Sequence, residues 1–291
     1  MKPAPFLYVA PGTVDEALSV LKEHGAEAKV LAGGQSLVPM MNLRLARPAV
    51  LVDLNRISGQ DGVRDGNSEV AIGFLTRQRA FETSPGLADR LPLLAEAISF
   101  VGHPAIRSRG TIAGSIAHAD PAAEIPAVVT VLDAEIVVRS ENKTRVIAAQ
   151  DFFIDLFTTV LEPTEIVVEI RIPRREVQGT AFLEVARRHG DFALVGVATT
   201  LAVSRDGTIE RATIALSGVA GTPVRAREAE QMLVGAKAAA AIFSEAGRAA
   251  GAPLAPTSDL HATAAYRKRL AAVLTERALS LAARRAGLEV S

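Results

Sequence analysis

Residues 111–126 read TIAGSIAHADPAAEIP, a run of small side chains that leads into a helix start. Asp120, Pro121 and Glu124 have the order of an N-cap, a first helical residue and an acidic first turn, so they predict that a helix begins there. The small residues before them leave the backbone uncovered. Free amides beside the positive end of a helix dipole bind phosphate, and the stretch therefore predicts an anion site.

A second loop of this kind comes earlier in the chain, with the sequence AGGQS at residues 32–36. Residues 29–31 before it read as a short buried strand. The loop lacks the GxGxxG pattern, and no Lys-Ser/Thr follows it as in a P-loop. By itself it favours a tight strand-to-helix connection. Two adjacent glycines would also let a pyrophosphate approach the backbone, with Gln35 and Ser36 as further donors. The occurrence of two such loops favours the phosphate interpretation.

The composition excludes several classes of site. The 291-residue chain has a formal net charge of zero and no cysteine, which rules out disulfides, thiolate nucleophiles and iron–sulfur clusters bound within it. Its five histidines are scattered, so we expect no metal site. A neutral chain without tryptophan is not expected to bind nucleic acid. No apolar run approaches the roughly 18 residues of a membrane span, and we expect a cytoplasmic protein.

The hydrophobic pattern predicts an α/β beginning and an α+β end. Strands are expected at residues 29–31, 49–54, 69–74, 134–139, 144–148 and 165–172, and helices at 13–24, 91–101, 120–132 and 151–157. Residues 37–45 are expected to be helical or irregular. After a linker at 173–176, strands are expected at 181–187, 192–203 and 208–216 and helices at 227–234, 238–249 and 261–286. The last helix carries many basic residues, which we interpret as a solvated face.

Three segments resemble one family. They read AGGQSLVPMMNLRLARP at 32–48, VGHPAIRSRGTIAGSIAHADPAAEIP at 101–126 and RRHGDFALVGVA at 187–198. Together they resemble the FAD-binding medium subunit of molybdenum hydroxylases, the carbon monoxide dehydrogenase and xanthine dehydrogenase flavoprotein family. Their order and spacing match as well, and the resemblance covers essentially the whole chain.

The resemblance implies a set of FAD-binding residues. Asp120 and Glu124 would lie at the ribose and adenine end, although either could serve only to cap a helix or complement its dipole. The backbone near Ile166 and Val167 would approach the flavin and adenine, and the strand that includes Phe192 would approach the isoalloxazine ring. The residues implied to cradle the pyrophosphate are Ala32, Gly33, Gly34, Gln35, Ser36 and Leu37 in the first loop and Thr111, Gly114 and Ser115 in the second.

The sequence departs from the family pattern at three places near the flavin. Leu183 and Glu184 stand where relatives usually have a lysine, Phe192 where tyrosine is common, and Ala113 where glycine is typical. These changes bear on the flavin potential and on the electron acceptor. No side chain is expected to be catalytic, and His103 and His118 are interpreted as structural.

The resemblance also implies the architecture and the role. The fold would be α+β, with a two-lobed FAD-binding domain of the PCMH/vanillyl-alcohol-oxidase type at residues 1–176 (lobes about 1–57 and 58–176). A C-terminal domain at 177–291 would carry a three-stranded antiparallel sheet and helices. Electrons would pass from [2Fe-2S] clusters in a small partner subunit through this FAD to an external acceptor. The molybdenum cofactor would lie in a large, molybdopterin-binding partner subunit, and we expect a dimer of heterotrimers.

Two alternative functions remain compatible with the residues. One is an autonomous FAD-dependent oxidoreductase of the same fold. The other is an assembly protein that has kept the fold and lost the flavin.

Overall fold

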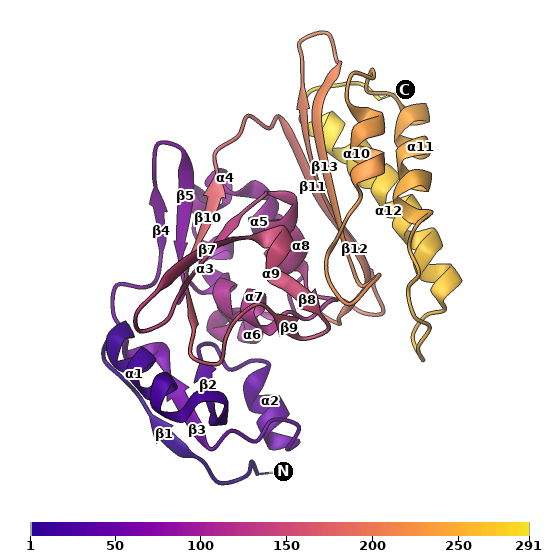
Figure 1. Ribbon diagram of the computed structural model, residues 1–291. Coiled ribbons are helices and arrows are strands. Elements are labelled where there is room, and N and C mark those ends of the chain that lie inside the picture. Colours follow the sequence, from indigo (N-terminus) through magenta and orange to yellow (C-terminus); the bar gives the residue numbers. More distant parts are fainter. Residues whose placement is uncertain (1, 291) are drawn as a thin grey trace.

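The computed structural model describes residues 2–290, and these residues form two hydrophobic cores. The first core is built from residues of the first 172 positions, and Phe182, Ala198 and Ala215 join it from the C-terminal part. The second core lies within the C-terminal part. Figure 1 shows three layers along the molecule, namely a small N-terminal lobe, a central lobe and the C-terminal sheet with its helices. Among the described residues, no helix is both long and apolar enough to cross a bilayer.

The N-terminal lobe is a parallel sheet of three strands in the order β1-β3-β2. Thr13 caps its first helix by accepting a hydrogen bond from the Glu16 N–H, and Gly25, at φ +52°, ends that helix. The helix predicted at 13–24 is thereby confirmed. The elements are β1 (Leu7–Val9), α1 (Val14–His24), β2 (Ala28–Leu31), α2 (Leu37–Asn42) and β3 (Val50–Asp53).

The central lobe is an antiparallel sheet of five strands in the order β4-β5-β10-β6-β7. Its strands are β4 (Val63–Asp65), β5 (Glu69–Gly73), β6 (Glu135–Arg139), β7 (Thr144–Ala148) and β10 (Ile166–Pro173). Six helices connect β5 to β6: α3 (Gln78–Thr83), α4 (Pro85–Arg90), α5 (Pro92–Ile98), α6 (Pro104–Arg109), α7 (Ile112–His118) and α8 (Glu124–Val131). The apolar face of these helices and the sheet enclose the first core.

The helix predicted to begin after Asp120 begins four residues later. Its first residue is Glu124 and its N-cap is Ala123, so the capping role predicted for Asp120 is wrong. Asp120 instead accepts a hydrogen bond from the Ala122 N–H at 2.9 Å, in a turn. The turn is needed because Ala119, at φ +52°, ends α7 in the left-handed region and redirects the chain.

The helix predicted at 151–157 is also wrong. A short α9 (Ala149–Phe152) is followed by a hairpin of β8 (Phe153–Asp155) and β9 (Thr158–Thr159). Phe157 lies at the tip with φ +54°, a conformation that no helix contains.

The C-terminal sheet has the predicted three long strands and one short addition. The strands are β11 (Gly179–Ala186), β12 (Ala193–Val203), β13 (Ile209–Ser217) and the two-residue β14 (Val224–Arg225), in that order. Helices α10 (Arg227–Leu233), α11 (Ala240–Gly251) and α12 (Ala264–Arg285) cover the sheet face that points away from the central lobe (Figure 1). The two strands predicted at 181–187 and 192–203 are confirmed, except that Arg187 and Phe192 lie in the turn between them.

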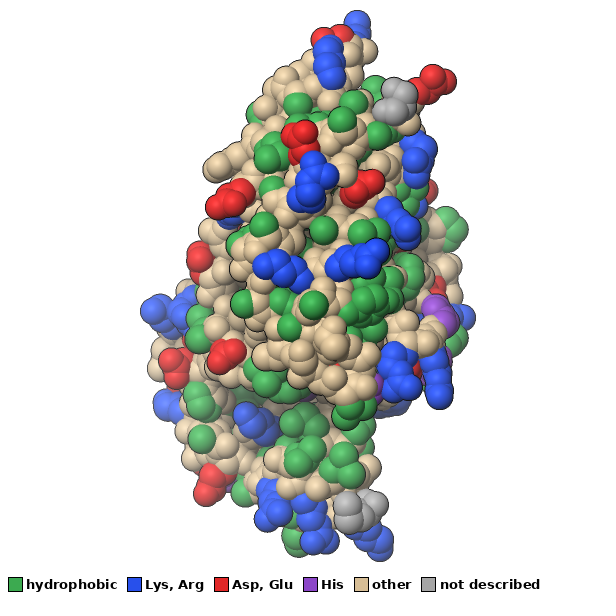
Figure 2. Space-filling view, turned by 90° about the vertical axis from the view of Figure 1, so that its right-hand side faces the viewer, with side chains coloured by type: hydrophobic (Ala, Val, Ile, Leu, Met, Phe, Trp, Pro, Cys, Tyr) green, Lys and Arg blue, Asp and Glu red, His purple; other side chains and the backbone are tan. Residues whose placement is uncertain are grey.

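The basic last helix is not entirely a solvated face. Arg267 is buried, donates to the carbonyl oxygens of Leu194 and Gly218, and forms an ion pair with Asp259 at 2.6 Å. It therefore ties α12 to the start of β12 and to the residue that follows β13. On the face shown in Figure 2, which includes these helices, basic and acidic side chains are interspersed and form no single basic patch.

Candidate functional site

The first loop leaves β2 through a glycine that another residue would strain. Gly34 has φ +74°, and a Cβ added there would lie 3.0 Å from the Leu31 side chain. Its carbonyl accepts a hydrogen bond from the Val38 N–H, which leads the chain into α2. The loop is therefore a tight connection, as its sequence suggested.

The same loop also presents a run of free amides. The N–H groups of Gly33, Gly34, Gln35, Ser36 and Leu37 donate no hydrogen bond to any residue that the structure describes. Buried or half-buried amides are normally paired, and consecutive unpaired amides form a concave anion site. The first loop can thus both close a turn and hold an anion.

The second loop is closed on itself. Thr111 caps α7, and its Oγ1 accepts a hydrogen bond from the Gly114 N–H at 3.0 Å. The Ser115 N–H bonds to the Thr111 carbonyl and the Ile112 N–H to the Thr76 carbonyl. Within the described residues, the N–H groups of Thr111 and Ala113 are the amides of this turn that are left free.

The two loops touch through their backbones. A Cβ added to Gly33 would lie 2.4 Å from the carbonyl oxygen of Arg109 and 2.8 Å from the Cα of Gly110. Such distances are far below van der Waals contact, so only glycine fits at this position. The structure therefore brings together the two loops that the sequence placed some 75 residues apart.

A polar network that the sequence did not reveal joins the loops. The Asn55 Nδ2 donates to the carbonyl of Ala32 at 2.8 Å. The Arg77 guanidinium donates to the Asn55 Oδ1 and to the carbonyl of Arg109. Neither Asn55 nor Arg77 lies in a sequence motif. The one indication in the sequence was that Asn55 is a polar residue that follows a buried strand. These contacts fix the spacing of the loops.

Charged groups of both signs lie near the first loop. Burial and then the nearby Arg109 lower the pKa of Arg77, while Asp53 and Asp61 oppose that effect. A guanidinium remains charged at any physiological pH. The Arg77 guanidinium donates to the Arg109 carbonyl, which lies against Gly33, and so brings a cation to the loop with the free N–H groups. A cation beside free amides suits a pyrophosphate, which carries negative charge and many acceptor oxygens.

Glu124 and Asp120 lie at the two ends of the turn before α8. Glu124 is 6% exposed, and burial raises the pKa of its carboxyl group to about 7, with Asp120 adding to that effect. Glu124 has no ion-pair partner among residues 2–290. A carboxyl group in this state can either donate or accept a hydrogen bond.

The remaining candidate FAD-binding residues differ in how far their side chains are exposed to solvent. Ile166 and Val167 begin β10 with side chains 4% and 5% exposed in the first core, so only their backbones can reach a ligand. Phe192 is 71% exposed in the turn between β11 and β12. That turn rests on His103, because a Cβ at Gly190 would lie 2.6 Å from the histidine ring.

Of the two residues that replace the family lysine, only Glu184 faces the central lobe. Leu183 packs on the opposite side of the sheet, in the second core. Burial, and then Glu124, raises the pKa of Glu184 to about 8. Its Oε2 atom is buried and has no hydrogen-bond partner in the described part of the chain. Glu184 and Glu124 thus form a pair of buried carboxyl groups between the two domains.

Comparison with known families identifies both parts of the chain. Residues 4–175 match the FAD binding domain in molybdopterin dehydrogenase, and residues 180–282 match the CO dehydrogenase flavoprotein C-terminal domain. The presence of an FAD-binding domain is therefore confirmed.

The chain is also similar to known proteins over nearly their whole length. The chain is 40% identical to the 6-hydroxypseudooxynicotine dehydrogenase complex subunit alpha of Paenarthrobacter nicotinovorans, covering 98% of this chain and 97% of that one. It is 39% identical to the carbon monoxide dehydrogenase medium chain of Hydrogenophaga pseudoflava, covering 97% and 98%. Both are named as parts of larger enzymes.

Solved structures share the fold. A carbon monoxide dehydrogenase from Hydrogenophaga pseudoflava that lacks the Mo-pyranopterin moiety of its cofactor superposes with a TM-score of 0.94 at 40% identity, covering 98% of this chain and 99% of that one. Quinoline 2-oxidoreductase from Pseudomonas putida 86 superposes with a TM-score of 0.94 at 34% identity, covering 99% and 100%. The chain therefore belongs to the FAD-binding medium subunits of carbon monoxide dehydrogenase-type molybdenum hydroxylases, an oxidoreductase family.

Proposed function

We propose that the chain binds FAD with its pyrophosphate on the first loop and relays electrons through it. The observation that carries the proposal is the run of five free amides beside Arg77 and Arg109. Bound FAD supplies the redox chemistry, and the protein supplies position and electrostatics. No side chain of this chain is required as an acid, base or nucleophile.

The two loops have different tasks in this proposal. The amides of Gly33–Leu37 donate to the phosphate oxygens, and Ser36 adds a hydroxyl. In the second loop the Thr111 Oγ1 accepts from the Gly114 N–H, which leaves its hydroxyl hydrogen to donate to a ligand. That loop therefore contributes close approach, the free amides of Thr111 and Ala113, and the hydroxyls of Thr111 and Ser115.

The other candidates would surround the rest of the dinucleotide. Glu124 would bond to hydroxyls of the ribose end, and Asp120 would assist from the adjacent turn. The backbone of Ile166 and Val167 would line the central part, and Phe192 would border the flavin. A neutral Glu124 donates as well as accepts, which suits a hydroxyl-rich ligand.

We further propose partner subunits for the steps that this chain does not perform. The relatives are named as medium chains or complex subunits. Because the chain has no cysteine, thiolate-bound clusters belong to another subunit. In the proposed complex, a large subunit holds the molybdenum cofactor and a small subunit the [2Fe-2S] clusters, in a cytoplasmic dimer of heterotrimers.

Removal and return of the flavin tests this role. The complex is purified through a tag on this chain and stripped of FAD by mild chaotrope. Substrate should still reduce the iron–sulfur clusters, detected by electron paramagnetic resonance, while reduction of an external acceptor stops. Added FAD should restore acceptor reduction. Acceptor turnover that persists without flavin contradicts the proposed relay.

A further inference from the structure

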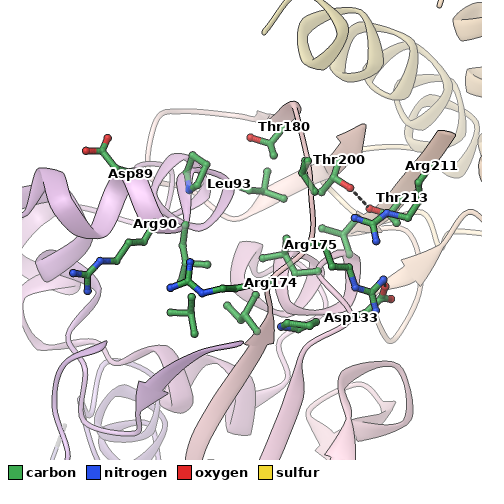
Figure 3. Close-up of a pocket in the computed structure, with 18 residues that line it drawn as sticks. Asp89, Arg90, Leu93, Asp133, Arg174, Arg175, Thr180, Thr200, Arg211 and Thr213 are labelled. Atoms are coloured by element: carbon green, nitrogen blue, oxygen red, sulfur yellow. Dashed lines mark hydrogen bonds and ion pairs between the residues drawn. The ribbon is translucent and has the colours of Figure 1, made fainter. Parts of the chain in front are cut away.

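A cavity of about 280 Å³ lies between the central lobe and the C-terminal sheet, and it contains none of the candidate FAD residues. Its walls come from the start of α5, the end of β10, the linker that follows and strands β11–β13 (Figure 3). It is therefore a second concave site, and it is formed by both domains together.

Arg211 brings an uncompensated charge to this cavity. It extends from β13, is half-buried, and has no acidic partner within ion-pair distance among residues 2–290. Its one hydrogen bond to a described residue is long, 3.4 Å to the carbonyl of Glu176. Burial and then the neighbouring Arg175 lower the pKa of Arg211, while Asp133 opposes that effect. A desolvated cation next to another cation is unfavourable unless an anion joins it.

Two acidic residues line the cavity, Asp133 and Asp89. Asp133 pairs with both Arg175 and Arg225, each at 2.6 Å, and Asp89 lies on the side of the cavity opposite Arg211 (Figure 3). Asp65 likewise pairs with Arg174 and with Arg90. Figure 3 shows the guanidinium groups of Arg175 and Arg211 turned toward one another beside Asp133. The cavity thus keeps an excess of positive charge at this end.

The rest of the lining divides into donors and an apolar wall. Thr180, Thr200 and Thr213 stand on three adjacent strands, and the last two share a hydrogen bond of 2.7 Å. That pair uses one hydroxyl hydrogen and leaves the other to donate elsewhere. Leu93 and Ile172 supply apolar surface to the same cavity.

We propose that this cavity binds a small organic carboxylate, with the carboxylate between Arg175, Arg211 and the threonine hydroxyls and its apolar body on Leu93 and Ile172. A single unpaired guanidinium fork matches a bidentate monoanion. The volume suits a ligand of roughly ten non-hydrogen atoms. Because both domains line the cavity, the ligand stabilises their arrangement.

Benzoate is the probe for the test, with benzyl alcohol as its neutral counterpart and inorganic phosphate as an anion without an apolar body. The flavin-loaded chain should bind benzoate saturably at one site in calorimetry, and its Tm should rise with benzoate concentration. Benzyl alcohol should have neither effect, and phosphate should bind more weakly than benzoate.

Arg211→Gln should weaken benzoate binding roughly ten- to a hundred-fold. Arg205→Gln, in the exposed turn between β12 and β13, makes the same charge change outside the cavity and should leave binding unchanged. Thr180→Val keeps the side-chain shape and should weaken binding by a few-fold. Unchanged circular dichroism and flavin content confirm that each variant is folded.

Three outcomes overturn the proposal. The first is no saturable benzoate binding, or phosphate binding as tightly as benzoate. The second is an equal loss in Arg211→Gln and Arg205→Gln, which indicates a general ionic effect. The third is benzoate binding by the separate chain but not by the assembled complex, which indicates that an acidic group of a partner subunit fills the cavity.

Discussion

The two small-residue loops look alike in sequence but use their backbones in opposite ways. The first leaves five consecutive amides free, whereas in the second the Thr111 hydroxyl and carbonyl accept from Gly114 and Ser115. Both begin a short helix, so the difference does not come from secondary structure. It comes from the capping residue: Ser36 makes no side-chain cap to α2, while Thr111 caps α7.

This difference separates two reasons for small residues beside a cofactor. In the first loop they uncover donors, and Gly34 adopts the left-handed backbone that aims them. Gly33 in the same loop permits contact, because the Arg109–Gly110 backbone that leads into the second loop packs directly on it. Donor presentation and close packing should respond differently to substitution.

Gly33→Ala is expected to have the largest effect, the loss of bound FAD from the purified chain. The added methyl group would lie 2.4 Å from the Arg109 carbonyl and push the loops apart. Gly86→Ala is the matched control, because a methyl group there meets nothing within 4 Å. Flavin content is measured by absorbance after acid release. Equal flavin content in the two variants would show that the contact between the loops is dispensable.

Arg77→Gln should weaken FAD binding roughly ten- to a hundred-fold, because it removes a charged donor that joins Asn55 to Arg109. Arg79→Gln changes an arginine of the same helix that pairs with Glu82 instead, and it should bind FAD normally. Equilibrium dialysis gives both affinities. If the Arg77 variant bound FAD as tightly as the Arg79 variant, the contacts of Arg77 with Asn55 and Arg109 would not contribute to FAD binding.

Glu124→Gln should change how stability depends on pH. The folded-state pKa of about 7 lies above the ordinary 4.5, so the folded state keeps a proton that the unfolded state loses. Stability is therefore lost as pH rises from about 4.5 to about 7, on the order of 2 kcal/mol. Urea unfolding of the flavin-free chain at pH 5 and pH 8 should show this fall in the parent and a smaller one in the variant. If stability fell equally in the parent and in the variant, a group other than Glu124 would be responsible for the pH dependence.

Thr111→Val should have the smallest effect on FAD, about three-fold or less, while lowering stability by about 1 kcal/mol through loss of the helix cap. Thr13→Val removes the same kind of cap from α1 and should lower stability similarly without any change in FAD binding. If Thr111→Val abolished FAD binding, the second loop would be a donor site and not a packing surface.

The sequence predicted the elements better than their junctions. The hydrophobic pattern located β10 and β12 to within two residues, because β10 buries much of its length and β12 buries nearly every residue. It misplaced the start of α8, since the left-handed Ala119 that redirects the chain has no signature in residue type. The hairpin at Phe157 was missed for the same reason.

In the candidate site, too, local features could be predicted from the sequence and tertiary contacts could not. The two glycine loops were visible as local motifs, but their contact at Gly33 and the Asn55–Arg77 network depend on tertiary packing. Burial of Arg267 and Glu184 likewise arises only when distant strands and helices meet. Local pattern therefore indicated which segments matter, and the fold determines how they act.

The most direct test of the first loop as the pyrophosphate site compares flavins that differ in phosphate. The flavin-free chain is titrated with FAD, with FMN and with riboflavin, and the dissociation constants are measured by fluorescence quenching. We predict that FAD binds far more tightly than riboflavin, and that Gly33→Ala removes most of this difference. Riboflavin affinity equal to that of FAD would contradict the account.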